Sequence, residues 1–175
     1  KSVKFALPVP CCDEVASKVG GAKYFTTLDL QWGFPQIEND PSAAEYTAFA
    51  IPGRCYHLNV LLFGAANNPC VFQRLMSTVL DGLLGTHPLN YIDDIFITGK
   101  TVVEVCENMN IVFDRLEQAN LMVGFEKVFP CRRSRVFLGF LLDENGIRPD
   151  PEKVKTFQNM TPPKTFYEVR QLVGF

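Results

Sequence analysis

The sequence predicts an α+β fold, in which a mostly antiparallel sheet has helices packed on one side. Helical and strand patterns alternate along the chain, but not in the strict rhythm of a parallel strand–helix–strand sheet. Turn residues also join neighbouring strand patterns directly, as in hairpins, at Pro52-Gly53-Arg54 and at Asn145-Gly146. With 175 residues, 47% of them hydrophobic, the chain suits one domain with a substantial core.

The beginning of the chain predicts a short helix, a strand and a hairpin. Cys11–Val19 has the pattern of a short helix, and two glycines stop it. The aromatic and β-branched run Tyr24–Leu30 predicts a strand that ends near Asp29. The apolar runs Tyr46–Ile51 and Tyr56–Leu62 predict the two strands of the hairpin.

The clearest helix pattern follows this hairpin. Asn68 can cap the helix, Pro69 suits the first helical position, and Gly85 ends it. Apolar residues recur at helical spacing and predict one buried face: Val71, Phe72, Leu75, Met76, Val79, Leu80, Leu83 and Leu84.

An acidic pair, Asp93-Asp94, lies in a predicted strand–turn–strand unit. Leu89–Thr98 is apolar except at four polar positions, and the pair falls at the turn. Thr101 and Glu104 then form a capping box for a helix that runs to about Ala119. The apolar stripe of this helix consists of Val105, Met109, Val112, Leu116 and Ala119.

The last third of the chain predicts more strands and two short helices. Leu121–Val123 and Val136–Leu142 have strand patterns. A turn at Asn145-Gly146 then leads to Ile147, and Asp150-Pro151 begins a short helix. After the linker Pro162-Pro163, Thr165 and Glu168 cap a last helix that reaches Phe175.

Composition argues against several classes of protein. No apolar run approaches the roughly 20 residues that cross a bilayer, so no membrane association is expected. Lys1–Pro10 lacks the pattern of a signal peptide. The six cysteines contain no C-x-x-C pair, and His57 and His87 are the only histidines, which argues against a zinc-binding module.

The charge distribution gives one local signal for an anionic partner. The net charge of −2 provides no global attraction to nucleic acid. Arg132, Arg133 and Arg135 form a basic cluster. The cluster fits either a solvated loop or a contact to phosphate, and the sequence leaves both interpretations open.

The acidic residues predict a metal site. Two adjacent carboxylates, Asp93 and Asp94, are unfavourable together without a cation, and Mg²⁺ prefers oxygen ligands. Asp29 ends an earlier apolar strand, and neighbouring strands of one sheet would bring it to Asp93. Two ions about 4 Å apart can activate a 3′-hydroxyl and stabilise a leaving pyrophosphate. The alternative is that the pair is a solvated surface turn.

The segment Tyr91-Ile92-Asp93-Asp94 resembles the Tyr-x-Asp-Asp box of reverse transcriptases. Its flanks resemble the polymerase of gypsy-type LTR retrotransposons and their retroviral relatives. The similar segments follow one another in order over nearly the whole chain: Gly20–Phe25, Leu28–Leu30, Gln36-Ile37, Phe63-Gly64, Asn67, Pro69, Phe72–Met76, Glu126-Lys127, Phe137–Gly139, Gly146–Val154 and Pro163–Thr165.

This resemblance implies a palm-and-fingers polymerase fold and RNA-directed DNA synthesis. It implies one domain over residues 1–175, with palm at 24–37 and about 87–142, partial fingers at about 1–23 and 38–86, and the start of the thumb at about 143–175. The implied enzyme transfers nucleotides from dNTPs to a primer 3′-hydroxyl on an RNA or DNA template. The implied cofactor is a pair of Mg²⁺ ions, with Mn²⁺ as the other possibility.

The resemblance also assigns roles to individual residues. Asp29, Asp93 and Asp94 are the implied metal ligands, and Leu30 contributes its backbone. Phe34 takes the place of an aromatic gate against the 2′-hydroxyl, with ordinary core packing as the alternative. Phe63 and Gly64 are implied to contact the incoming nucleotide, and Gln73 the template. Tyr91, Leu138 and Gly139 are implied to contact the primer. Lys127 is implied to donate a proton to the leaving pyrophosphate, and the alternative is that it is a solvated lysine.

Some positions depart from the family's pattern. Trp32 replaces a small residue, Pro35 stands where a histidine is common, and Leu61-Leu62 stands where Met-Pro is usual. Ala66-Asn67-Asn68-Pro69 replaces Thr-Asn-Ala-Pro. These changes leave a second interpretation open, a catalytically inactive nucleic-acid-binding or structural relic of such an element.

The resemblance implies a larger parent protein. A fingers hairpin with Lys and Arg side chains would precede Leu7-Pro8, so the isolated chain is expected to be weakly active or inactive. RNase H, integrase and protease regions of a pol polyprotein are expected outside this chain. The expected location is intracellular, in a cytoplasmic virus-like particle or the nucleus.

Overall fold

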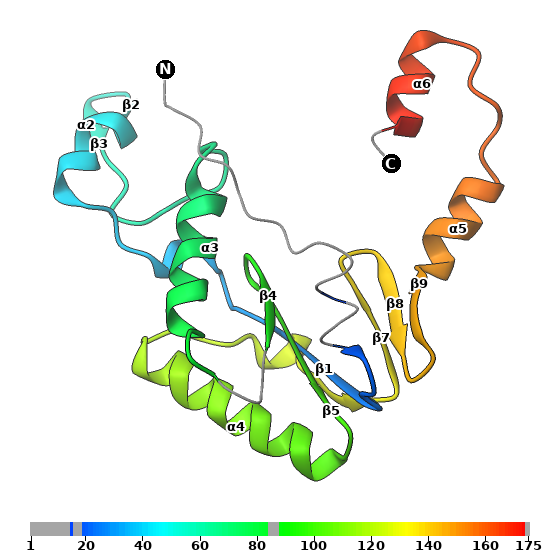
Figure 1. Ribbon diagram of the computed structural model, residues 1–175. Coiled ribbons are helices and arrows are strands. Elements are labelled where there is room, and N and C mark those ends of the chain that lie inside the picture. The colour runs from blue at the N-terminus through cyan, green and yellow to red at the C-terminus, as the bar shows by residue number, and fades with distance from the viewer. Residues whose placement is uncertain (1–14, 16–18, 84–87, 174–175) are drawn as a thin grey trace.

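The computed structural model describes residues 15, 19–83 and 88–173, and a four-stranded antiparallel sheet lies at its centre (Figure 1). The strand order is β4-β5-β1-β6. These strands are β1 (Tyr24–Asp29), β4 (Leu89–Tyr91), β5 (Asp94–Gly99) and β6 (Phe129–Arg132). β1 and β5 pair along their whole length. The predicted α+β fold with a mostly antiparallel sheet is therefore confirmed.

Two helices cover one face of this sheet, α3 (Asn68–Val79) and α4 (Val102–Gln118) (Figure 1). Side chains alternate along a strand, so Leu28 of β1 and Ile95 of β5 point to the same face. Burying each such side chain contributes about 1.5–3 kcal/mol. The helical side chains that complete this core are Phe72, Met76, Val112 and Leu116.

The opposite face of the sheet carries a second core. Phe25 and Phe96 stack there at a centroid distance of 5.8 Å, and Phe137 stacks on Phe96 at 4.8 Å. Val15 and Val19, both helical, are buried in the same core. Phe137 belongs to a separate three-stranded sheet with consecutive strands β7 (Ser134–Phe137), β8 (Phe140–Asp143) and β9 (Gly146–Pro149).

Two peripheral groups of elements lie on opposite sides of the central sheet (Figure 1). One group is α2 (Ala44–Thr47) with the hairpin β2 (Phe49–Ile51) and β3 (Arg54–Tyr56). The other group is α5 (Pro151–Gln158) and α6 (Phe166–Val173). Short 3-10 helices occur between the main elements: η1 (Phe34–Gln36), η2 (Pro41–Ala43) and η3 (Phe125–Lys127). Among the described helices, none is both long and apolar enough to cross a bilayer.

Three of the helix starts predicted from capping residues are confirmed. The Thr101 hydroxyl accepts a hydrogen bond from the Glu104 N–H at 3.1 Å. Asp150 accepts one from the N–H two residues later, and Pro151 follows it in the first turn of α5. Thr165 and Glu168 form the predicted reciprocal pair, with the Glu168 carboxylate accepting from the Lys164 and Thr165 N–H groups.

The first hairpin differs from its prediction at both strands. Tyr46 lies in α2, and the second strand is Arg54–Tyr56 rather than Tyr56–Leu62. The turn uses only Pro52 and Gly53, whose φ of +81° suits glycine, so pairing resumes at Arg54. Leu58 to Leu61 instead hydrogen-bonds to the segment around Asn39.

Two further strand predictions need correction, and one strand was missed. Val136–Leu142 is not one strand, because Leu138 (φ +50°) and Gly139 (φ +80°) turn the chain between β7 and β8. In Leu121–Val123 the structure has only an isolated bridge, from Val123 to Leu30. β6 was not predicted at all; it adds to the free edge of β1.

Helix α3 starts one residue earlier than predicted. Asn67 occupies the cap position, and Asn68 is the first helical residue. The Asn68 side chain donates to the Leu62 carbonyl at 2.6 Å, which ties the helix start to the preceding loop. The predicted end at Gly85 is wrong, because α3 ends at Val79 and residues 80–83 are not helical; Gly85 itself lies outside the described residues. Most of the predicted helix 11–19 lies outside them as well.

Candidate active site

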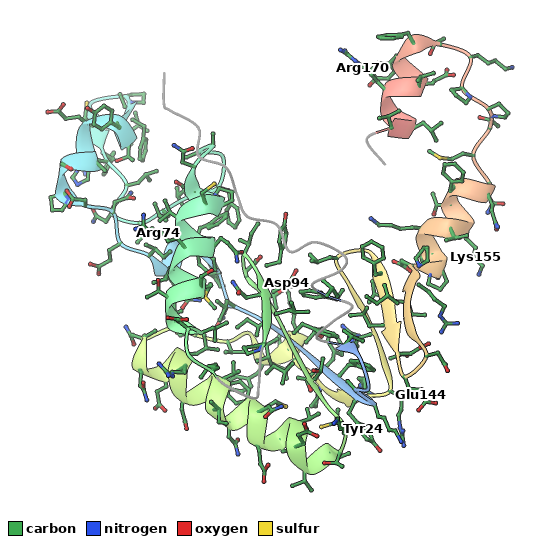
Figure 2. All side chains as sticks on the ribbon, viewed as in Figure 1. Tyr24, Arg74, Asp94, Glu144, Lys155 and Arg170 are labelled. Carbon is green, nitrogen blue, oxygen red and sulfur yellow. The ribbon has the colours of Figure 1, made fainter. Side chains whose placement is uncertain are left out.

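Asp29 and Asp94 are direct partners across two antiparallel strands. Asp29 is the last residue of β1, Asp94 is the first residue of β5, and the register pairs their Cα atoms. Directly opposed residues have Cβ atoms about 4.5–5.5 Å apart, where two like charges destabilise the pair. Asp93 precedes Asp94 in the turn, and its carbonyl accepts a hydrogen bond of 3.1 Å from the N–H of the buried Leu30. The three carboxylates therefore lie at one end of the sheet, where Figure 2 labels Asp94.

The turn between β4 and β5 is held by a side chain from α3. Ile92 has a φ of +54°, a left-handed conformation that is unfavourable for a β-branched residue. Gln73 is 4% exposed; its Oε1 accepts from the Ile92 N–H at 2.6 Å, and its Nε2 donates to the Asn90 carbonyl at 3.3 Å. The amide of Gln73 thus hydrogen-bonds to the backbone of the protein itself, whereas the family resemblance implied a contact to the template.

The environment of the acidic turn disfavours its ionised form. Burial raises the pKa of Asp93 above its ordinary value, and the nearby Asp29 carboxylate raises it further. Asp94 is more exposed, but partial desolvation raises its pKa as well, with added repulsion from Asp93 and Asp29. Lys127 opposes both shifts only in part. The site carries more negative charge than its own cation offsets.

Lys127 is that cation, and it is bound to Asp29. Its Nζ lies 2.9 Å from Asp29 Oδ2. Lys127 ends η3, and the N–H of Gly124 just before η3 donates to the Asp29 carbonyl at 2.9 Å. The hydrogen bond and charge of Asp29 raise the pKa of Lys127, so the ammonium form is favoured.

The donor chemistry of the site suits a hard divalent cation, since carboxylate oxygens are the ligands that Mg²⁺ and Mn²⁺ share. Within the described residues, however, no three His, Cys, Asp or Glu side chains form a group that could hold a metal ion. Asp29 faces Lys127 instead. Metal binding at Asp29 would require Lys127 to give up this contact.

A cavity of about 570 Å³ opens beside the carboxylates. Asp29, Asp93 and Lys127 contribute its polar wall. The exposed aromatic rings on its wall are those of Trp32, Phe63 and Phe125. The cavity therefore combines anionic groups, one cation and flat apolar surfaces.

Comparison with known proteins identifies the family. The profile of the reverse transcriptase (RNA-dependent DNA polymerase) family matches residues 2–142. The chain belongs to the reverse transcriptase family. It is 37% identical over 167 residues to the retrovirus-related Pol polyprotein from transposon 297 of Drosophila melanogaster, and 33% identical over 174 residues to that from transposon gypsy. These alignments cover 95% and 99% of this chain.

Solved reverse transcriptases share the fold. A foamy viral protease–reverse transcriptase in complex with double-stranded DNA superposes with a TM-score of 0.86 at 26% identity, over 98% of this chain. The foamy viral enzyme in complex with an RNA/DNA hybrid gives a TM-score of 0.79 at 28% identity, over 91% of this chain. The chain spans 16–17% of the two Pol polyproteins and 30% and 22% of the two solved chains. The predicted palm-and-fingers polymerase fold and retroelement family are thus confirmed.

Of the three residues predicted to contact the nucleotide in this reverse transcriptase fold, one lines the cavity and two do not. Phe63 lines the cavity. Phe34 is half-buried and packs edge-on against Phe63 at 5.0 Å and Phe72 at 5.5 Å, and it is absent from the cavity lining. Gly64 is exposed with a φ of +102°, and a Cβ there would meet no atom within 4 Å.

Of the three residues predicted to contact the primer, one lies on the wall of a second, smaller cavity of about 180 Å³. Leu138 lines it together with Asp94 and Arg135. Gly139 completes the β7–β8 turn, and Tyr91 packs against the second core. In the arginine cluster, Arg135 lies over the Phe129 ring at 4.1 Å and Arg133 lies over the Tyr24 ring at 4.3 Å.

Sequence reasoning missed two features of the site. Gln73 is a polar residue within the buried face of α3, between Phe72 and Met76, which is a signal for a satisfied internal hydrogen bond. Trp32 and Phe125 were not predicted to line the cavity. Only their folded positions bring them there, because neither forms part of a periodic pattern.

Proposed function

We propose that this chain is the catalytic core of an RNA-directed DNA polymerase. The reaction is transfer of a nucleotide from a dNTP to a primer 3′-hydroxyl on an RNA or DNA template, by a two-metal mechanism. The observation that carries this proposal is the pairing of Asp29 with Asp94 across the sheet, with Asp93 beside them on the wall of a cavity. The complexes of foamy viral enzymes with double-stranded DNA and with an RNA/DNA hybrid support the assignment of template–primer as partner.

Asp29, Asp93 and Asp94 would hold the divalent ions, with the backbone of Leu30 nearby, and Mg²⁺ or Mn²⁺ suits these oxygen donors. When bound, such ions supply Lewis-acid activation of the hydroxyl nucleophile and charge neutralisation on the phosphates. The protein contributes a fixed turn: Gln73 and the Leu30 N–H restrain the backbone on both sides of Asp93. A fixed backbone limits the reorganisation needed during phosphoryl transfer.

Lys127 is positioned for a role in proton transfer. Its Nζ lies at Asp29 and on the cavity wall, and the raised pKa keeps it protonated at neutral pH. On this proposal it donates a proton to the leaving pyrophosphate. Phe63 and Gly64 face the nucleotide, Phe34 sets the space beside the sugar, and Tyr91, Leu138 and Gly139 support the primer end next to Asp94.

The proposed organisation follows from these roles. Residues 24–37 and about 87–142 are the palm, residues 1–23 and 38–86 belong to the fingers, and about 143–175 begins the thumb. Since the chain spans about a sixth of the Pol polyproteins that it matches, RNase H, integrase and protease regions are proposed for the parent protein. A cytoplasmic virus-like particle or the nucleus remains the proposed location.

The test is extension of a 5′-labelled DNA primer on an RNA template with Mg²⁺ or Mn²⁺. The assay uses this chain and, in parallel, the chain within its longer reading frame. Extension should depend on the metal and disappear in the Asp93→Asn variant. Asp143→Asn is a matched control, because this aspartate lies at the end of β8 and pairs with Arg148. Equal extension by Asp93→Asn and wild type would contradict the proposal.

One observation favours a second function. The described carboxylates do not form a ready metal group, and Lys127 occupies Asp29. A nucleic-acid-binding relic would bind template–primer without extending it. Gel-shift binding that persists in the longer reading frame, with no extension in Mg²⁺ or Mn²⁺, would support this alternative.

A further inference from the structure

Trp32 is an exposed aromatic residue on the wall of the cavity beside Asp29 and Asp93. It is the only tryptophan of the chain, and 73% of its surface is exposed. Single exposed apolar residues are common in proteins and need no explanation. Here, however, Phe63 and Phe125 line the same cavity with similar exposure, 73% and 77%. The three rings come from separate segments, after β1, before α3 and in η3, so the fold gathers them.

The backbone at Trp32 is strained and fixed. Trp32 has a φ of +56°, a left-handed conformation that is unfavourable for a non-glycine residue. The Gln36 side chain ties the loop down: it donates to the Gln31 and Met122 carbonyls and accepts from the Met122 N–H at 2.6 Å. The Gln31 N–H also donates to the Met122 carbonyl at 2.9 Å. The loop therefore holds a large ring beside the site in an unfavourable backbone conformation.

The position of the ring relative to the carboxylates is also set. Gly33, the next residue, is buried, and a Cβ there would lie 3.3 Å from the Asp93 Cβ. Trp32 therefore directly precedes a residue that packs closely against the acidic turn. A ligand that reaches Asp93 through a divalent cation would pass close to the indole ring.

The chemistry of the cavity selects one class of ligand. Asp29, Asp93 and Glu126 outnumber Lys127, so a phosphate-bearing ligand would enter together with divalent cations. Flat apolar rings beside such a charged group suit the base of a nucleotide, because every base offers a π-face for stacking. We infer that Trp32 is a nucleotide-binding residue whose indole ring stacks on the incoming nucleotide in this cavity. This inference rests on the proposed polymerase function and adds a contact to it.

The single tryptophan makes the contact directly measurable. The 175-residue chain is mixed with Mg²⁺ and a dideoxy-terminated hairpin template–primer, so that no chemistry follows binding. The complementary dTTP is then titrated while tryptophan emission is recorded, with free N-acetyltryptophanamide as the control for light absorption by dTTP. Emission should be quenched and shift to shorter wavelength as dTTP saturates, because stacking removes the indole from water.

Equilibrium dialysis of labelled dTTP gives the affinity independently. Trp32→Ala should weaken dTTP binding at least about fivefold, the lower end expected for loss of one base–aromatic stack. Trp32→Phe should retain most of the affinity. Phe166→Ala should not change it, because Phe166 is similarly exposed, at 78%, but lies on α6 outside the cavity.

A stability measurement separates binding from folding. Trp32→Gly removes the ring and suits a φ of +56°, so thermal unfolding should occur at or above the wild-type temperature while dTTP binding weakens. A lower unfolding temperature with unchanged dTTP affinity would assign Trp32 a structural role and overturn the inference. Unchanged affinity and emission in a chain that binds dTTP would overturn it too, and leave the polymerase proposal intact. Failure of the folded wild type to bind dTTP would count against both.

Discussion

The buried amide of Gln73 on α3 accepts the backbone N–H of Ile92 at 2.6 Å, and so fixes the turn that carries Asp93. The bond joins residues 19 positions apart and stabilises a left-handed residue next to a catalytic candidate. A helix of the first core thereby controls the geometry of the acidic turn, which makes Gln73 a positioning residue.

Gln73→Leu should lower the free energy of unfolding by about 1–3 kcal/mol, because the Ile92 N–H would lose its acceptor in a part-buried turn. It should also reduce primer extension, since Asp93 would be less well fixed. Urea unfolding and extension assays measure the two effects. Arg74→Leu is the matched control on the exposed side of α3, where Figure 2 labels Arg74, and it should leave stability within about 0.5 kcal/mol. Equal stabilities for the two variants would contradict the positioning role.

Asp93→Asn should abolish extension and yet stabilise the fold at neutral pH. Burial and Asp29 raise the pKa of Asp93 in the folded state, so the folded protein binds a proton more tightly than the unfolded chain. Stability therefore falls as the pH rises from the ordinary value of 3.8 through the raised folded pKa, and stays reduced above it. Thermal unfolding from pH 4 upward should show this fall in wild type and a smaller one in Asp93→Asn. A variant that is less stable than wild type at pH 7 without metal would refute the argument.

Lys127→Met should increase the affinity of the site for a divalent ion. The ammonium lies 2.9 Å from Asp29 Oδ2 and competes for the oxygen that a metal would use. Binding of Mn²⁺ followed by electron paramagnetic resonance measures this affinity without any reaction. Extension should slow in the same variant if Lys127 supplies the proton to pyrophosphate. Lys155→Met, on α5, is the matched control and should change neither property. Weaker Mn²⁺ binding by Lys127→Met would show that the ammonium does not compete.

Phe34→Val should weaken discrimination against ribonucleotides if Phe34 limits the space beside the sugar. It should also lower stability by about 1–3 kcal/mol, because the ring packs edge-on against Phe63 and Phe72. Incorporation of single ribonucleotides and deoxyribonucleotides gives the ratio to compare. Phe49→Val, which loses a ring pair with Tyr56 in the peripheral hairpin, is the control for general loosening. A loss of stability with an unchanged ratio would leave Phe34 as a core residue only.

Local patterns of the sequence predicted much of the fold. The capping box of Thr101 and Glu104 and the cap of Asp150 involve groups two to four residues apart, so short segments suffice to recognise them. The strand–turn–strand unit was equally clear, because two apolar runs flank its turn, but the turn lies at Ile92 and Asp93 rather than at the predicted pair Asp93-Asp94, and Asp94 already belongs to β5. Strand ends were less predictable. In the apolar run Val136–Leu142, Gly139 is the single residue that favours a turn, and the left-handed backbone of Leu138 beside it does not follow from its residue type.

The sequence by itself determined to which family the chain belongs and which residues are the candidates for its chemistry. Residue type and order along the chain are enough for that: Asp29, Asp93 and Asp94 stand among ordered family motifs. Only the tertiary structure decided how these residues face one another. It set Asp29 opposite Asp94 through the register of β1 and β5 and brought Lys127 to Asp29 across 98 positions. It also placed Trp32 on the wall of the cavity that Asp29 and Lys127 line. The physical reason is that strand register and loop closure depend on the packing of the whole core. No single segment of the sequence contains enough information to predict that packing.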